Sequence, residues 1–253
     1  MRVLSALLSV VVAVGVVSGC SLINRLTGPD PREYFDDPRQ VQVIEAAERF
    51  DVDRIRALAA SGVDLNGVGN THDPRRSRLP LLFFVVEYSG ANAVTAMLRA
   101  GADPLRRDSG NYSPAGYAIL RDKISSLRAI LDYDAKLVES PDRLGGNILH
   151  TATLYSNRDA ITLLLQRHVD LNTRESVSGE TPLFVAATER QIDICMTLLD
   201  AGADASIRNR RGRTFSYPLY MANEKILSAD FKRDRSRLED ELRRRGFPVE
   251  TGR

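Results

Sequence analysis

Two phrases in this chain are nearly the same, AGADPLRRD at residues 100–108 and AGADASIRN at residues 201–209. Their aspartates, Asp103 and Asp204, lie 101 residues apart. A weaker copy, RHVDLN, places Asp170 34 residues before Asp204, and 101 is close to three such steps. The phrase therefore marks a repeat.

A second set of phrases keeps the same period. LPLLFF, YSPAGYA, NILHTA, TPLFVAA and RTFSYP place equivalent residues at steps of 34, 34, 34 and 33, namely Leu79, Ser113, Asn147, Thr181 and Thr214. A strict period in this range indicates a stack of similar supersecondary units, each unable to bury its apolar face without its neighbours.

One period shows what the unit contains. Residues 181–203 read TPLFVAATERQIDICMTLLDAGA, with apolar residues at spacings of three and four that predict two short helices. Thr181 can cap the first helix with its hydroxyl, and Pro182 suits the first helical position. Gly202 supplies the stop, because a helix end that turns back favours a residue at positive φ. A helix pair opened by TPLH-like residues and closed by GAD resembles the ankyrin repeat.

The resemblance covers residues 40–250 and implies an all-α fold, an ankyrin-repeat solenoid of about six helix-turn-helix units joined by hairpin-like loops. The first unit lacks the TPLH-like opening, as an N-terminal cap would. The last unit ends in a charged helix whose thin apolar stripe, Phe231, Leu238 and Leu242, predicts a C-terminal cap. Two units close differently, with Asp134-Ala135-Lys136 and with His168 in place of GAD glycines, which leaves their loop geometry open.

The N-terminus reads MRVLSALLSVVVAVGVVSGC, a lone arginine and an apolar run that ends in small residues. This pattern predicts a signal peptide at residues 1–19, and VSGC resembles the lipobox of bacterial lipoproteins. The resemblance implies that Cys20 carries acyl chains and that residues 20–39 form a lipidated N-terminus and flexible tether. Ser21 resembles the pattern of lipoproteins anchored in the outer membrane and facing the periplasm. The alternative is an uncleaved hydrophobic helix.

Composition and motifs argue against several functions. Lys+Arg 35 against Asp+Glu 33 gives no general attraction for nucleic acid. Cys195 is the only cysteine besides Cys20, and its helix register predicts a small buried side chain. His72, His150 and His168 are scattered over different repeats, and the ankyrin resemblance gives His150 a loop-bracing hydrogen bond. No catalytic motif is present, so we expect no enzyme activity, cofactor, metal or small-molecule substrate.

The ankyrin resemblance places binding contacts at the loop tips, here called fingertips, and on the exposed side of the first helices. The fingertips hold a row of arginines: Arg106, Arg107, Arg143, Arg174, Arg208, Arg210, Arg211 and Arg213. One interpretation is a set of solvated loop charges, since Asp108, Glu175 and Glu180 lie among them. The other is a site for a protein partner with an acidic surface.

The first helices add residues at matching register: Leu120, Arg121, Leu154, Tyr155, Thr188 and Glu189. Leu154 and Tyr155 are candidates for an apolar anchor, or alternatively pack against the neighbouring unit. The insertion at residues 67–78, with Arg75 and Arg76, widens the first loop and either extends the same groove or covers it.

These observations predict a non-enzymatic protein-interaction module tethered to the bacterial envelope, binding a periplasmic or secreted protein. Two specific roles stay open. One is an immunity lipoprotein that inhibits a toxin effector; the other is an accessory factor for a periplasmic enzyme such as a catalase, a role that some bacterial ankyrin proteins resemble. A further alternative is that the arginine row lies on anionic lipid.

Overall fold

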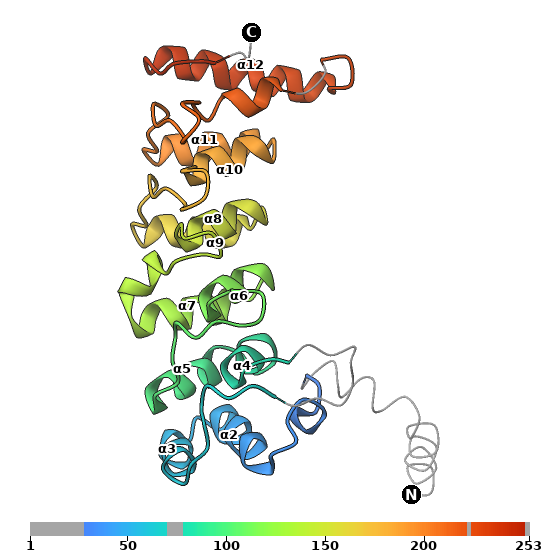
Figure 1. The fold of residues 1–253 in the computed structure, drawn as a ribbon, viewed down its shortest axis with the longest axis vertical. Helices are drawn as coiled ribbons and strands as arrows, with labels where there is room; N and C mark the ends of the chain where they lie inside the picture. The colour runs from blue at the N-terminus through green and yellow to red at the C-terminus, as the bar shows by residue number, and fades with distance from the viewer. Residues whose placement is uncertain (1–27, 70–77, 222–223, 251–253) are drawn as a thin grey trace, which may run out of the picture. The chain divides into compact units, whose positions relative to one another are not determined.

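The structure is a computed structural model that describes residues 28–69, 78–221 and 224–250. The predicted signal peptide, Cys20, Arg75, Arg76 and His72 lie outside the described residues. The chain divides after Ala102 into two compact units. The described residues form helices and isolated bridges, with no strand among them, in agreement with the predicted all-α solenoid (Figure 1). None of the described helices is long and apolar enough to cross a bilayer.

The first unit contains two helix pairs. Its elements are the 3-10 helix η1 (Pro31–Glu33), α2 (Pro38–Glu48), α3 (Val52–Ala60), α4 (Leu81–Tyr88) and α5 (Ala91–Ala100). Helix α4 reads LLFFVVEY and is buried along nearly its whole length. An apolar helix of this kind is stable only when neighbours cover it on every side.

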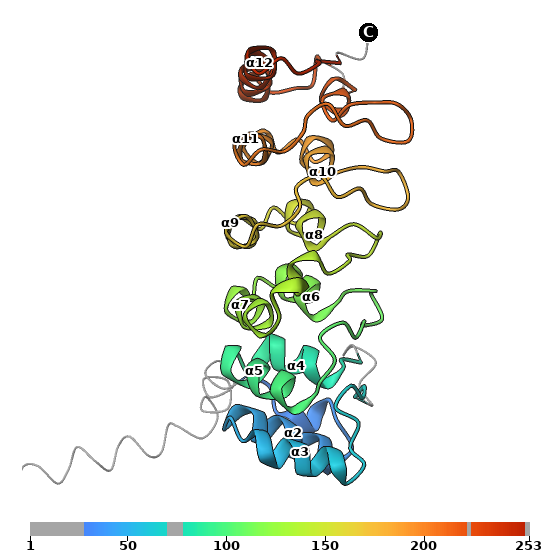
Figure 2. The same ribbon diagram turned by 90° about the vertical axis from the view of Figure 1, so that its left-hand side faces the viewer.

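The second unit contains three helix pairs and a cap. Its elements are α6 (Pro114–Leu120), α7 (Ile124–Tyr133), the 3-10 helix η2 (Ala135–Glu139), α8 (Ile148–Leu154), α9 (Arg158–Gln166), α10 (Pro182–Thr188), α11 (Ile192–Asp200), the 3-10 helix η3 (Tyr217–Tyr220) and α12 (Ala229–Arg244). Helices α6, α8 and α10 form one row and α7, α9 and α11 another, and the hairpin loops extend from the first row (Figure 2).

The repeated phrase caps two of the helices that it precedes. Ser113 accepts a hydrogen bond from the amide of Gly116 at 3.2 Å, and Asn147 forms a capping box with His150. The Thr181 hydroxyl, which we expected to cap α10, makes no capping hydrogen bond. Thr181 is buried, and α10 begins at Pro182, a residue suited to the first helical position because it has no amide hydrogen that needs an acceptor.

The helix ends show the conformation of the two loops whose geometry the sequence left open. Gly101 and Gly202 end their helices at φ 108° and 100°, in the left-handed region. His168 adopts the same conformation at φ 56° and so replaces the expected glycine. Asp134 is extended instead, with φ −146°, and the chain continues into η2. The departure at residues 134–136 therefore changes the loop, whereas the departure at His168 does not.

The predicted tether is wrong for residues 28–39. Asp37 caps α2 by accepting the amide of Arg39 at 2.8 Å, and Phe35 is only 2% exposed. The Phe35 ring meets Phe84 of α4 edge to face, with centroids 5.5 Å apart. Residues 28–39 are too few to show a hydrophobic period, so the sequence alone does not reveal that Phe35 anchors this segment to the first unit.

Helix α12 buries two of the three residues of the predicted apolar stripe. Leu238 and Leu242 of α12 are each 1% exposed, while Phe231 is partly exposed. Arg235, which lies on the same helix, is buried and donates to the carbonyl of Leu219 at 3.1 Å. Cys195 is fully buried, as its register predicted, and burial raises the pKa of its thiol.

Phe35→Ala should destabilise the first unit by about 3 kcal/mol, because truncating a buried phenylalanine leaves a cavity. Hydrogen exchange of the α2 amide groups measures the loss. Arg49→Ala, which changes a side chain that is 75% exposed, serves as the control and should stay within about 0.5 kcal/mol. Equal protection in both variants would mean that residues 28–37 do not hold α2 in solution.

Candidate protein-interaction surface

The hairpins of the second unit share an internal brace. In each hairpin, a side-chain oxygen accepts backbone amides further along the same loop, an arrangement that fixes a turn locally. Asp108 accepts from Gly110 at 2.9 Å and Tyr112 at 2.8 Å, Asp142 accepts from Leu144 and Gly146 at 2.8 Å, and Asn209 accepts from Arg211 at 3.0 Å and Arg213 at 3.1 Å.

Glu175 takes this place in the third hairpin, with a longer side chain that is only 4% exposed. Burial by itself raises its pKa. Hydrogen bonds from the Ser178 hydroxyl and from the amides of Glu180, Val177 and Ser178 outweigh burial and lower the pKa to about 2. The buried carboxylate is therefore ionised and part of the loop, not free to meet a partner.

Backbone hydrogen bonds join the last three hairpins of the second unit. The amide of Ser176 donates to the carbonyl of Leu144 at 2.8 Å, and the amide of Arg210 donates to the carbonyl of Ser178 at 2.8 Å. These bonds link the loops across repeats. The fingertips are thus one connected edge rather than separate solvated loops.

Three of the predicted fingertip arginines strengthen this edge. Arg107 donates to the carbonyl of Asn111 in its own hairpin at 2.6 Å and to that of Pro141 in the next hairpin at 2.8 Å. Arg174 does the same with Gly179 at 3.1 Å and Arg208 at 2.8 Å. Arg107 and Arg174 therefore brace neighbouring hairpins.

Arg208 also braces its own hairpin, by donating to the carbonyl of Gly212 at 2.6 Å, and forms an ion pair with Glu250. Among the described residues, it is the one predicted fingertip arginine with a carboxylate partner. Glu250 further accepts the amide of Thr214 at 3.0 Å. The last hairpin therefore already binds a carboxylate.

Two further arginines lie on aromatic rings. Arg143 places its guanidinium carbon 5.1 Å from the centre of the Tyr112 ring, and Arg213 lies 4.2 Å from that of Tyr217. Arg106, Arg210 and Arg211 are exposed, and their side chains make no hydrogen bond or ion pair within the described part of the chain.

The positive charge is uneven along the edge. In the first three hairpins, arginines alternate with Asp108, Asp142 and Glu175, whereas RNRRGR at residues 208–213 holds four arginines and no acid. Arginine is therefore densest in the last hairpin, where Glu250 offsets the charge of Arg208.

The predicted helix positions are accessible. Leu154 is 41% exposed and Tyr155 is 39% exposed, while Leu120 is half-buried. Arg121, Thr188 and Glu189 are exposed. The Tyr155 hydroxyl lies 2.5 Å from that of Tyr112, so Tyr155 contacts the neighbouring repeat and still presents ring surface to solvent. Which of these residues touch a partner stays a prediction.

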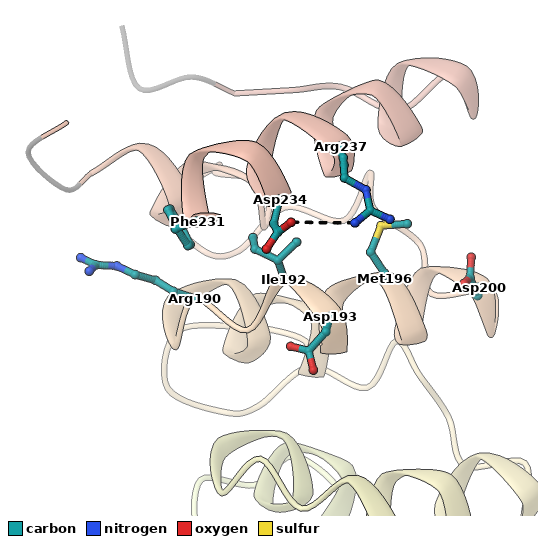
Figure 3. Close-up of a pocket in the computed structure, with 8 residues that line it drawn as sticks. All are labelled: Arg190, Ile192, Asp193, Met196, Asp200, Phe231, Asp234 and Arg237. Atoms are coloured by element: carbon teal, nitrogen blue, oxygen red, sulfur yellow. Dashed lines mark ion pairs between the residues drawn. The ribbon is translucent and has the colours of Figure 1, made fainter. Parts of the chain in front are cut away.

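The described part of the second unit has a groove at the predicted contact residues and another that the sequence did not predict. One, of about 460 Å³, is lined by residues that include Leu120 and Tyr155. The other, of about 680 Å³, lies between α11 and α12, where Met196 and Phe231 line it among charged residues (Figure 3). No sequence motif indicates this groove, because it is created by the packing of α11 on α12.

Three acidic residues that line the α11–α12 groove are already paired with arginines. Asp193 forms an ion pair with Arg158, and Asp200 forms one with Arg245. Asp234 forms an ion pair with Arg237 one turn further along α12 (Figure 3). The described residues also contain no cluster of side chains suited to a metal ion.

His150 has the bracing role that the resemblance implied. Its Nδ1 accepts the amide of Asn147 at 3.2 Å, which leaves Nε2 protonated and 3.1 Å from the carbonyl of Glu180 in the next repeat. The ring is 3% exposed. A buried histidine bonded on both nitrogens joins repeats and is not placed for catalysis.

This geometry of helix pairs and linked hairpins agrees with comparisons to known proteins. Residues 117–209 match the family model for ankyrin repeats (3 copies). The ankyrin repeat domain of Bcl-3, a member of the IkappaB family, has a similar solved fold, with a TM-score of 0.64, 22% identity and coverage of 81% of this chain and 86% of that one. The chain is therefore an ankyrin-repeat protein, and its array is a protein-interaction scaffold, not a typical enzyme fold.

Among its relatives is YahD of Escherichia coli (strain K12), described as an ankyrin repeat protein and 29% identical over 187 residues, 71% of this chain and 87% of YahD. Protein PhlB of Serratia liquefaciens is 35% identical over 107 residues, 42% of this chain. The chain spans 45% of PhlB and 17% of a related Acanthamoeba polyphaga mimivirus protein. These likenesses do not supply a partner.

Glu175→Gln should lower stability at neutral pH by about 3 kcal/mol. The pKa of Glu175 in the fold, about 2, lies below the usual 4.5, so ionisation stabilises the fold fully above pH 4.5 and is lost as the pH falls toward 2. The difference between wild type and variant should therefore shrink over that window. Urea denaturation at several pH values measures it, with exposed Glu189→Gln as the control. A difference that stays constant with pH would contradict this role.

Proposed function

We propose that this protein is an envelope-tethered lipoprotein that binds a periplasmic or secreted protein with an acidic surface. The observation that carries the proposal is the pairing of one connected hairpin edge, most positive at residues 208–213, with the exposed Leu154 and Tyr155. Aromatic residues and arginines are enriched in binding hot spots, and charge complementarity accelerates and directs association.

The binding surface runs from the hairpins to the exposed ends of α6, α8 and α10. Guanidiniums that bond neutral carbonyls keep their charge, and Arg107 and Arg174 are held in place by such bonds. A partner carboxylate would then meet charges whose side-chain entropy is already lost. This pre-ordering favours recognition of an acidic protein over loose attraction of any anion.

The partner's identity would decide between the two roles that the sequence left open. A secreted toxin whose activity falls on binding would make the protein an immunity inhibitor. A resident periplasmic enzyme whose activity or amount rises would make it an accessory factor. The tether through acylated Cys20 would place either complex at the membrane surface, and Ser21 favours the outer membrane.

Arg210→Glu with Arg211→Glu should reduce capture of the partner about tenfold or more, because two exposed charges are reversed at the most positive hairpin. The full chain, immobilised in detergent, is exposed to envelope extract and secreted proteins, and retained proteins are quantified by mass spectrometry. This pair leaves the bracing arginines intact, so the hairpin stays folded.

Arg128→Glu with Arg237→Glu carries the same charge change on α7 and α12 and is the matched control. A protein lost from the first variant and kept by the control supports the hairpin site. Equal loss in both variants would contradict it and indicate attraction to overall charge. Binding of phosphatidylglycerol vesicles by the unlipidated chain would support the lipid alternative instead.

Cys20→Ser should move the protein from the membrane fraction to the soluble periplasmic fraction, because the substitution removes the sulfur that acyl chains modify. Cell fractionation with metabolic palmitate labelling measures both consequences. Cys195→Ser is the control. The Cys195 thiol is buried, so this substitution should leave the labelling unchanged. Membrane retention without label would instead favour the uncleaved hydrophobic helix.

A further inference from the structure

Three side chains form a chain of polar contacts between the third and fourth repeats. Arg143 donates from Nη1 to the Tyr112 hydroxyl at 2.9 Å, and the Tyr112 and Tyr155 hydroxyls lie 2.5 Å apart. The tyrosine rings are 6.5 Å apart between centroids and tilted by 50°. Tyr112 is 7% exposed, and Tyr155 is 39% exposed. The contacts therefore lead from an exposed arginine through a buried phenol to an exposed one.

The direction of the hydrogen bonds follows from the donors. A guanidinium only donates, so the Tyr112 oxygen accepts from Arg143. Accepting from this charged donor makes the Tyr112 hydroxyl the stronger donor of the two phenols, so we assign its proton to the Tyr155 oxygen, which leaves the Tyr155 proton to point outward. Hydrogen bonds in series polarise one another, and the positive charge at the start of this series makes the last hydroxyl a stronger donor.

We propose that Tyr155 donates this hydrogen bond to a carboxylate of the protein partner, with Tyr112 and Arg143 as positioning residues. The inference rests on the proposed function, because it names the partner group that this surface recognises. Burial raises the pKa of Tyr155, so the phenol is protonated and can donate at neutral pH.

The surroundings favour a carboxylate on an aliphatic stem. Arg143 forms no ion pair within the described residues, so its charge is available to an anion. Leu154 beside Tyr155 is 41% exposed, and Leu144 beside Arg143 is 51% exposed. A glutamate side chain of the partner, flanked by an apolar residue, meets the phenol with its oxygen and the leucines with its methylenes.

The test uses two short peptides as probes, acetyl-Leu-Glu-Leu-amide and its glutamine counterpart. The full chain, labelled with carbon-13 at the tyrosine Cζ atoms and held in detergent, is titrated with each peptide by NMR. The Tyr155 signal should shift with the glutamate peptide, which should bind about tenfold more tightly than the glutamine peptide. Equal affinity of the two peptides would overturn the proposal.

Three variants separate the relay from general surface contact. Tyr155→Phe should lose the preference for the glutamate peptide, and Tyr112→Phe should weaken it several-fold by breaking the series. Tyr133→Phe, the same change at a 45% exposed tyrosine of α7, is the matched control and should leave it unchanged. A preference that survives in Tyr155→Phe would overturn the proposal. So would Tyr155-dependent binding of phosphatidylglycerol vesicles in place of the peptide.

The same variants distinguish this inference from the proposed function. If the glutamate preference is absent but the full chain still captures an envelope protein in a hairpin-dependent way, the relay is wrong and the proposed function stands. If the preference depends on Tyr155 but no envelope or secreted protein is retained, the carboxylate site stands and the proposed function is wrong.

Discussion

No first helix of the second unit could be stable alone. Helices α6, α8 and α10 have seven residues each, below the length at which isolated helices persist in water. Their stability comes from burial against the next pair, and their spacing comes from the bonds that join neighbouring hairpins. The rest of the structure depends on this constraint, because every repeat is at once a folded element and the support for its neighbour.

Much of the fold could be predicted because the residues that define each repeat lie close together in the sequence. The period of 34 residues, the side-chain caps at Ser113 and Asn147 and the glycines that end two of the second helices can all be read within a short window of sequence. The exceptions are informative. Thr181 has a capping residue's identity without its bond, and His168 replaces a glycine by adopting the glycine's conformation. The residue types alone do not show that Thr181 makes no capping bond or that His168 adopts positive φ, because both depend on the packing around these residues.

The candidate site was predictable only in outline. Register placed the arginines on loops and Tyr155 on a first helix, but it could not show which charges join hairpins or lie on rings. Phe35 was assigned to a tether because its partner, Phe84, lies far along the chain. The contact of Tyr112 with Tyr155 is hidden for the same reason. Long-range side-chain pairs leave no periodic trace in a single sequence.

The carbonyl-bound arginines have a consequence for how salt acts on this protein. Arg107 and Arg174 brace the hairpins through neutral acceptors, and short hydrogen bonds of this kind are little affected by dissolved ions. The charge that the same side chains project outward falls off over about 8–10 Å at moderate ionic strength. The stability of the hairpins and the electrostatic attraction of a partner therefore respond differently to salt. Ionic strength can tune how fast a partner arrives without loosening the surface on which it lands.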